Sequence, residues 1–248
     1  MPTQFSVITV CYNAASCIQP TIESLAAQTW PHIEYIVVDG LSKDGTQAIV
    51  QGYGDRISTF VSEKDKGIFD AMNKGIALAT GDVLFFLNAD DAYCDPQVLA
   101  DVARCFDADP ALELVYGNVI LTSGSARRRR SFHWVNARNI YYGDLCHQVV
   151  FARRSVFERL GGFDLKLPTD ADYDWLLRVF HSGAKVRYID RDITYFAEGG
   201  FHTQNAAAHE QERWGIKTRF RPAWRVWLGY WLLRAELKLR KLKGESIA

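Results

Sequence analysis

The chain has 248 residues, of which 48% are hydrophobic and 23% charged, and this ordinary composition excludes a disordered or fibrous protein. The length suits one large α/β domain, or one domain with a helical tail. The formal net charge is zero, but residues 213–243 carry ten Lys or Arg and one acid, whereas residues 1–212 have a balance of −8. A basic tail on an acidic body favours an anionic partner for the tail.

The cysteines and the N-terminus indicate where the chain works. Five cysteines without a CxxC pair cannot form a complete disulfide framework, which favours a reducing compartment. Residues 1–4 do not resemble a signal peptide, and no window of 18 uncharged apolar residues predicts a membrane-spanning helix. We therefore expect a cytoplasmic protein.

Strand-like and helix-like segments alternate along the first half of the chain. Strands are expected at residues 5–10, 33–38, 57–61, 83–87 and 112–121. Helices are expected at about 14–28, after the turn 42–46, at 67–79, and from Asp95-Pro96, with Asp95 as N-cap. Further on, the pattern predicts a helix over 170–181 and a strand over 186–190. Four βα units predict an α/β fold with a mostly parallel, doubly wound sheet.

Polar residues follow each of the first four expected strands. They are Tyr12-Asn13, Asp39, residues 63–66 and the turn Asn88-Ala89-Asp90-Asp91. Ligands of doubly wound sheets bind at the carboxyl ends of the strands, so we expect these residues to converge on one crevice. No GxGxxG follows the first strand and no P-loop motif occurs, which excludes the common phosphate cradles.

The acidic turn at residues 88–91 predicts a cation site. Adjacent acids at the end of a buried strand repel one another unless a cation or hydrogen-bond donors compensate. Because nucleoside diphosphates are anions, carboxylates can hold them through a bridging Mg²⁺ or Mn²⁺. The alternative is a cluster of turn and cap residues leading into Asp95-Pro96, and Asp39 before Gly40 has a similar alternative.

Three stretches together resemble the family 2 glycosyltransferases of the GT-A fold: residues 7–13, 37–46 and 81–91. Residues 62–75 look like the bacterial exopolysaccharide, O-antigen and colanic-acid branch, and the resemblance extends over roughly residues 5–200. It implies a single GT-A catalytic domain over residues 1–203, with a nucleotide-sugar half (1–121) and an acceptor half (122–203). A basic, Trp-rich helical tail over residues 204–248 would follow.

The resemblance implies roles for residues of the first half. Asp39 would accept hydrogen bonds from the nucleobase, and Asp65 would lie near the base or ribose. The turn resembles the family's DXD motif with Asn88 at its first position, so Asp90 is the implied metal ligand and Asn88 would contact ribose or a metal-bound water. The implied nucleotide-sugar-binding set is Tyr12, Asn13, Asp39, Asp65, Lys74, Asn88, Asp90 and Asp91.

The second half is expected to supply a catalytic base. Inverting transfer needs a carboxylate that takes the proton of the acceptor hydroxyl. Residues 170–178 hold three acids two apart, and the family pattern matches Asp172 to the base. Asp170 is also placed to cap the helix, and Asp174 in its first turn suits the helix dipole, although both are assigned here to the acceptor side.

Two histidines and a neighbouring glutamine are further candidates. His147-Gln148 resembles a pair that lines the acceptor side in this branch, and the alternative is a solvated pair at a strand edge. His202 follows a Gly-Gly loop and could close over the diphosphate or metal.

Residues 206–243 are predicted to be helical with a break near Pro222. Trp and Leu recur at steps of three and four between basic residues, which is typical of a helix lying on anionic lipid. Residues 222–243 are thus expected to place the protein at the inner face of the cell membrane, and core packing or a homodimer contact are the alternatives. Arg127 to Arg130 form either a solvated edge or an anion contact.

The sequence therefore predicts a metal-dependent, inverting glycosyltransferase. It would move a sugar from a nucleoside-diphosphate donor, with UDP favoured, to a lipid-linked saccharide in surface-polysaccharide synthesis, with no nucleic-acid partner. A sugar nucleotidyltransferase is the first alternative, but residues 12–16 lack the Gly-rich basic loop that a triphosphate needs. A non-catalytic, membrane-associated scaffold with a decayed site is the second, kept open by Asn88. The segment Glu210 to Trp214 is a near-match to the QxxRW motif of processive relatives and is interpreted as chance.

Overall fold

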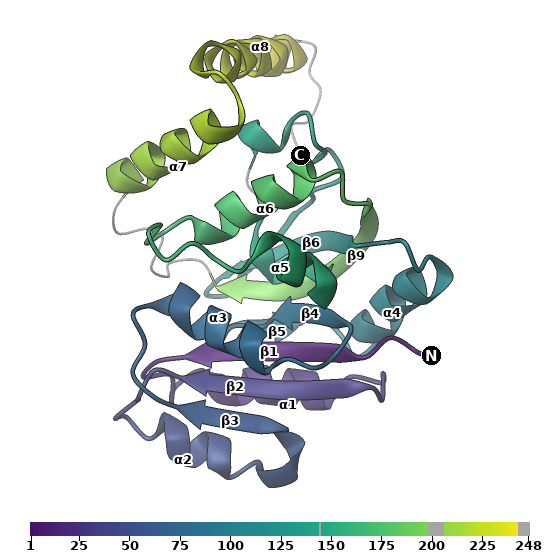
Figure 1. Ribbon diagram of the computed structural model, residues 1–248, viewed down its shortest axis with the longest axis vertical. Coiled ribbons are helices and arrows are strands. Elements are labelled where there is room, and N and C mark those ends of the chain that lie inside the picture. The colour runs from purple at the N-terminus through teal and green to yellow at the C-terminus, as the bar shows by residue number, and fades with distance from the viewer. Residues whose placement is uncertain (144, 198–205, 243–248) are drawn as a thin grey trace.

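The structure is a computed structural model that describes residues 1–143, 145–197 and 206–242 (Figure 1). Its strands are β1 (Phe5–Cys11), β2 (Ile33–Asp39), β3 (Thr59–Ser62), β4 (Val83–Phe86), β5 (Ala92–Tyr93), β6 (Leu114–Ser123), β7 (Ala126–Arg130), β8 (Val150–Arg153) and β9 (Val186–Ala197). Its α-helices are α1 (Ile18–Ala26), α2 (Thr46–Gln51), α3 (Ile68–Leu78), α4 (Val98–Ala108), α5 (Arg154–Leu160), α6 (Ala171–His181), α7 (Ala206–Phe220) and α8 (Ala223–Leu242).

The described strands form one sheet in the order β3-β2-β1-β4-β8-β6-β9-β5, with β7 paired to β6. Strands β1 to β4 are parallel to one another, and β9 is parallel to β6. Strand β8 runs antiparallel to both β4 and β6 and so joins the two halves. The predicted α/β fold with a mostly parallel, doubly wound sheet is confirmed, and its antiparallel pairs lie in the second half.

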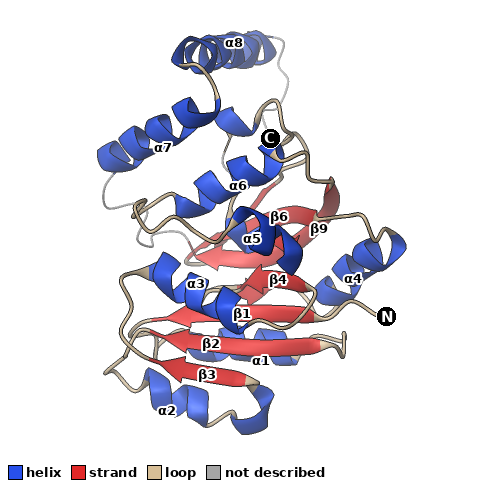
Figure 2. Cartoon of the chain, in the orientation of Figure 1, coloured by secondary structure: helices blue, strands red, loops and turns tan. Residues whose placement is uncertain are grey.

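Helices cover both faces of the sheet, with α3 in front of β1 and β2 and α1 behind them (Figure 2). Strand β1 is therefore buried along its whole length, which explains its continuous apolar sequence. On the front face, Gly75 of α3 approaches Ile8 of β1 so closely that a Cβ at position 75 would lie 2.4 Å from the Ile8 side chain. Stacking of Phe85 on Phe151, with ring centroids 4.1 Å apart, extends the core from β4 to β8.

Several element boundaries differ from the sequence predictions. Helix α4 begins at Val98, so the prediction of Asp95 as its N-cap was wrong. The Asp95 carboxylate instead accepts hydrogen bonds from the Gln97 backbone and from both Nη atoms of Arg191, at 2.6 and 2.7 Å. This bidentate ion pair ties Asp95 to β9. Helix α1 is shorter than expected, and β9 continues past residue 190 because it pairs with the full length of β6.

The four arginines at residues 127–130 form the outer strand β7, which agrees with the solvated-edge interpretation. Arg129 pairs with Asp190 and Asp192 at 2.5 Å each, so β9 neutralises part of this charge.

The tail forms two helices at the end of the molecule opposite β3 and α2 (Figure 1). Helix α7 ends at Phe220 and α8 begins at Ala223, so the predicted break near Pro222 is confirmed. Among the helices described, none combines the length and apolar character needed to cross a bilayer.

The contact between α3 and β1 predicts opposite effects for two glycine substitutions. Gly75→Ala should lower the free energy of unfolding by about 1–3 kcal/mol, because the new methyl group overlaps the buried Ile8 side chain. Gly215→Ala on α7 is the matched control, since no atom lies within 4 Å of its added Cβ, and it should gain up to about 1 kcal/mol from helix propensity. Urea unfolding measures both, and shifts of the same sign would contradict this description of the interface.

Candidate active site

The loops that follow β1, β2 and β3 meet at one edge of the sheet, as predicted. Cys11 pairs with Asp39, and Asp39 pairs with Ser62, so these strands end side by side. A Cβ on Gly40 would lie 2.5 Å from Asp65 Oδ2 and 3.3 Å from the Tyr12 ring. Glycine at position 40 therefore allows Tyr12 and Asp65 to approach the β2 loop.

The loops after β1 and β2 are joined by hydrogen bonds from backbone N–H groups to side-chain oxygens. The Asn13 N–H donates to Ser42 Oγ at 2.8 Å, and the Lys43 N–H donates to Asn13 Oδ1 at 3.0 Å. Asn13 and Leu41 have left-handed φ values of 50° and 66°, and they are the non-glycine residues of the described chain with positive φ. Such strained conformations cluster at functional sites, which supports this crevice as one.

Asp39 is fully buried, and its carboxylate holds the residues after β2 and at the end of β3 in place by hydrogen bonds. It accepts hydrogen bonds from the Ser42 N–H at 3.0 Å, from Ser62 Oγ at 2.6 Å and from the Ser42 hydroxyl. Burial, and next the adjacent Asp39, raise the pKa of the Cys11 thiol far above its ordinary value. The two serines were not recognised as site residues from the sequence. The nucleobase role of Asp39 stays a prediction, and the structure adds a loop-anchoring role.

Lys74 lies at the rim of the crevice on α3. Its ammonium contacts Glu63 Oε1 at 2.8 Å and donates to the Lys64 carbonyl at 2.9 Å. The hydrogen bond to Glu63 raises the pKa of Lys74, so this side chain stays cationic. It holds the loop after β3 against α3, and its predicted contact with the nucleotide sugar remains untested.

The acidic turn after β4 is held in shape from the helix behind it. The Thr21 hydroxyl of α1 lies 2.7 Å from the Asp91 carbonyl and 2.9 Å from the Ala89 carbonyl. The Asp91 N–H donates to the Asn88 carbonyl at 3.0 Å and closes the turn. As a result Asp90 is exposed to the crevice, whereas the Asp91 side chain is buried beneath it.

Three buried oxygens of this turn fit a divalent cation. Asn88 Oδ1 and both carboxyl oxygens of Asp91 have no hydrogen-bond partner among the described residues. Burial, and next the neighbouring Asp90, raise the pKa of Asp91 well above its ordinary value. These oxygens and the Asp90 carboxylate are donors of the kind that Mg²⁺ and Mn²⁺ prefer.

A cation at this turn would depend on the nucleotide for much of its coordination. No group of three or more His, Cys, Asp or Glu side chains in the described parts of the chain is placed to hold a metal ion. Mg²⁺ sites of nucleotide enzymes commonly use one or two carboxylates plus substrate phosphates, and the exposed Asp90 would be the main protein ligand of such an ion. His202 lies outside the described residues.

A chain of three side chains connects the acidic turn to the acceptor half. Asn88 Nδ2 lies 3.1 Å from His147 Nε2, and His147 Nδ1 lies 2.8 Å from Asp172 Oδ2. His147 is buried and Asp172 is largely buried, so little water competes with these contacts. The structure thus brings together the predicted donor residue Asn88, the acceptor-side His147 and the predicted base Asp172.

The hydrogen-bond chemistry of this chain assigns the protons. Ionised Asp172 only accepts, so His147 Nδ1 carries the hydrogen that points to it. In a neutral imidazole Nε2 then accepts, and the Asn88 amide supplies the matching N–H. An ionised carboxylate at position 88 could not donate this bond to a neutral imidazole, which gives a physical reason for asparagine at the first position of the motif.

Gln148 lies in the same short 3-10 turn as His147 (His147–Val149), directly before β8. Its backbone carbonyl accepts from Thr194 Oγ1 at 2.9 Å, and the residue is buried. Gln148 therefore fixes the turn that carries His147 onto β9, and its predicted acceptor contact stays a prediction.

Asp170 is the N-cap residue of α6, but its side chain bonds to α7 instead of capping the helix. Arg213 Nε donates to Asp170 Oδ1 at 2.6 Å, and His209 Nδ1 lies 2.7 Å from Asp170 Oδ2. Glu212 Oε1 accepts from the backbone N–H groups of Thr169 and Asp170 at 3.1 and 2.8 Å. Helix α7 therefore clamps the N-terminus of α6 two residues before Asp172. This clamp was not predicted from the sequence.

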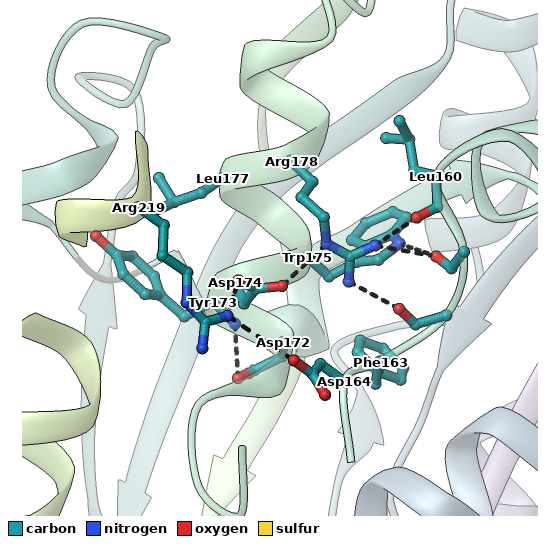
Figure 3. A network of polar contacts seen from close by, with 12 residues as sticks. Leu160, Phe163, Asp164, Asp172, Tyr173, Asp174, Trp175, Leu177, Arg178 and Arg219 are labelled. Carbon is teal, nitrogen blue, oxygen red and sulfur yellow. Dashed lines mark hydrogen bonds and ion pairs between the residues drawn. The ribbon is translucent and has the colours of Figure 1, made fainter. Parts of the chain in front are cut away.

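Asp174 lies in an ion network in the first turn of α6 (Figure 3). Its carboxylate accepts from Arg178 Nε at 2.9 Å and contacts Arg219 of α7 at 3.4 Å. The Arg178 guanidinium also donates to the Leu160 and Gly162 carbonyls, at 2.6 and 2.7 Å. These contacts favour a structural role for Asp174, since they fix the loop after α5 and the start of α6.

The clamp predicts a stability change that depends on pH. Burial raises the pKa of Asp170, and Arg213 is the largest opposing influence, so Arg213→Met should raise this pKa further. A raised folded-state pKa means that stability falls as pH rises from about 4 through the folded value. The loss should therefore reach about 3 kcal/mol near neutral pH and be smaller near pH 4.5.

Denaturant unfolding of Arg213→Met at both pH values tests this. Arg159→Met, which breaks the exposed pair with Glu113, is the control and should cost no more than about 1 kcal/mol. Adding Asp170→Asn to Arg213→Met should recover most of the loss at neutral pH. Equal losses at both pH values would contradict a charge clamp.

The sequence of this chain is similar to those of known glycosyltransferases. A family model described as Glycosyl transferase family 2 matches residues 6–162. A PGL/p-HBAD biosynthesis glycosyltransferase of Mycobacterium bovis is 35% identical over 205 residues, covering 79% of this chain and 77% of that protein. An uncharacterized glycosyltransferase of Mycobacterium tuberculosis is 33% identical over 176 residues, covering 70% and 67%.

Solved structures share the fold. The S. aureus TarS 1-349 complex with UDP-GlcNAc superposes with a TM-score of 0.73 and 21% sequence identity. The match covers 86% of this chain and 64% of the TarS 1-349 chain, so this chain spans somewhat less than two thirds of that chain's length. The mannosyltransferase PcManGT from Pyrobaculum calidifontis, in complex with GDP-Man and Mn²⁺, superposes with a TM-score of 0.70 and 20% sequence identity. The match covers 99% of this chain and 77% of that one. These matches confirm the GT-A type fold. The chain belongs to glycosyl transferase family 2.

Proposed function

We propose that this chain is an inverting, metal-dependent glycosyltransferase that uses a nucleoside-diphosphate sugar, with UDP favoured, and a lipid-linked saccharide acceptor. The observation that carries the proposal is the chain Asn88–His147–Asp172, which joins the donor turn to a carboxylate on the acceptor side. The donor class is supported by the relatives, because TarS binds UDP-GlcNAc and PcManGT binds GDP-Man. Family membership favours glycosyl transfer over the alternative sugar nucleotidyltransferase.

In this mechanism Asp172 accepts the proton of the acceptor hydroxyl while its oxygen forms a bond to C1 of the sugar. The bond between C1 and the diphosphate oxygen breaks, and the diphosphate leaves with the electron pair. His147 holds the Asp172 carboxylate in one orientation through its Nδ1–H. A divalent cation, when bound by Asp90, would offset the charge that develops on the leaving diphosphate.

Two substitutions separate the base from the donor site. Asp172→Asn should lower turnover by about 10²–10⁴-fold, because it removes the proton acceptor, and should leave donor affinity nearly unchanged. Asp90→Ala should instead weaken UDP-sugar binding in Mg²⁺ and abolish the effect of EDTA on that binding. Nucleotide release with a lipid extract as acceptor measures turnover, and calorimetry measures donor binding.

Asp55→Asn, an exposed acid in the 3-10 turn Gly54–Arg56 after α2, is the control and should behave as wild type. Near-normal turnover of Asp172→Asn would overturn the base assignment. Absence of any nucleotide-sugar binding by the wild-type chain would favour the decayed-scaffold alternative.

The surface of α8 supports a place for the protein at an anionic membrane. Trp224, Trp227 and Trp231 are each more than 60% exposed, and Leu228 and Leu232 are exposed beside them. Val226 is buried and Tyr230 packs on Tyr142, so the opposite side of this helix is held by the body of the protein. Exposed tryptophans on a basic helix are suited to the lipid headgroup region.

Binding to vesicles tests the role of α8. The double variant Trp224→Ser, Leu232→Ser should co-sediment less with vesicles that contain phosphatidylglycerol, because two apolar side chains no longer enter the interface. Raised salt should weaken binding of the wild-type chain, since it screens the basic residues. Leu165→Ser, an exposed leucine outside the tail, is the matched control. Equal sedimentation of all three proteins would end the membrane assignment.

A further inference from the structure

A carboxylate of α7 holds the chain at the point where it enters α6. Glu212 Oε1 accepts hydrogen bonds from the Thr169 N–H at 3.1 Å and from the Asp170 N–H at 2.8 Å. Both N–H groups precede Ala171, the first residue of α6, so no carbonyl of the helix itself accepts from them. An acid at the start of a helix also suits the helix dipole. Glu212 therefore fixes the place at which α6 begins.

The next residue of α7 holds the same point through a side chain. Arg213 Nε donates to Asp170 Oδ1 at 2.6 Å, and Asp170 is buried. The Asp170 carbonyl accepts from the Asp174 N–H at 3.0 Å, which is the first hydrogen bond of the helical turn. Helix α7 thus engages both the backbone and the side chain of the residue on which α6 starts.

The proposed base lies in the turn that these contacts hold. Asp172 Oδ1 accepts from the Tyr173 N–H at 2.8 Å, and Asp172 Oδ2 lies 2.8 Å from His147 Nδ1. One residue of a helix corresponds to a rise of about 1.5 Å. Because N–H···O hydrogen bonds rarely extend beyond about 3.2 Å, a displacement of the first turn by that rise is enough to break the contact with His147.

We propose that Glu212 is a positioning residue for the base. It holds the start of α6 and thereby keeps the Asp172 carboxylate against His147. This inference rests on the proposed function, in which Asp172 takes the proton of the acceptor hydroxyl. Glu212 lies beyond residues 6–162, the part of the chain that the family model matches, so that match assigns it no role. Helix α7 is then part of the catalytic apparatus, apart from any membrane role of α8.

Proton NMR of the protein without substrates tests the positioning itself. An imidazole N–H that donates to a carboxylate gives a proton resonance far downfield, and His147→Gln identifies the one that belongs to His147. Glu212→Met removes the acceptor of both backbone N–H groups at similar side-chain length, so this resonance should be lost or move upfield. Glu212→Gln keeps a carbonyl oxygen that can accept from both groups and should retain the resonance.

Kinetics of the same variants test the consequence for transfer. Glu212→Met should lower kcat by about 10–100-fold, because a misplacement of about 1 Å costs up to about two orders of magnitude in rate. UDP-sugar affinity, measured by calorimetry, should be unchanged, since the donor turn follows β4 and not α6. Glu212→Gln should stay close to wild type in both. Glu210→Met, which changes an exposed acid of the same helix, is the matched control and should alter neither.

A double variant separates this inference from the assignment of the base. If Glu212 acts through Asp172, Glu212→Met should lower kcat no further in an Asp172→Asn background. Near-normal turnover of Asp172→Asn would show that the proposed base is wrong, whatever the Glu212 variants do. A normal kcat of Glu212→Met beside a strong loss in Asp172→Asn would instead show that the base is right and the positioning role wrong.

Three further results would overturn the positioning role. An unchanged His147 resonance in folded Glu212→Met would show that the start of α6 does not depend on this carboxylate. Equal losses of kcat from Glu212→Gln and Glu212→Met would show that hydrogen-bond acceptance is not the property that matters. A parallel loss of kcat and UDP-sugar affinity would indicate a general loss of folding. Where Glu212→Met impairs folding, Glu212→Asp, shorter by one methylene, should show the same changes in a milder form.

Discussion

The hydrogen bond between His147 and Asp172 is the contact on which the proposed site depends, because it joins the proposed base to the imidazole that also meets the donor turn. His147 precedes β8, the strand that runs antiparallel between β4 and β6. The acidic turn follows β4 on the other side, so the Asn88 amide meets the same imidazole ring. A shift of β8 relative to β4 would separate the Asn88 turn from the proposed base, so the packing of Phe85 on Phe151 supports the geometry of the proposed site.

Sequence periodicity predicted the first half of the fold well because its βα units are formed from local pairs. Strands β1 and β4 are buried throughout and β2 over most of its length, and their apolar runs are therefore visible in the sequence. The second half was predicted less well because its pairings are distant in sequence. The length of β9 follows from its contact with β6, and the place of Asp95 follows from Arg191, which lies 96 residues further on.

The sequence also predicted some site residues better than others: it predicted those that follow parallel strands, but not the residues that support them. Tyr12, Asp39 and Asp90 follow strands directly, so the rule for parallel sheets was enough to bring them to one edge. The supporting contacts were not predictable from such a rule. Ser62 and Thr21 are ordinary polar residues whose importance comes from the carboxylate and the carbonyls that the fold brings to them. In the sequence, Arg213 stood out only as part of a near-match to a motif. Its ion pair with Asp170 is known from the structure alone.

The surroundings of the three acids of α6 support Asp172 as the base. Asp170 is held by Arg213 and Asp174 by Arg178, so both carboxylates are engaged in contacts that anchor α6. Asp172 accepts the hydrogen bond of His147, whose imidazole also meets the donor turn through Asn88. Asp172 is therefore kept as the proposed base, while the two outer acids anchor the helix that presents it.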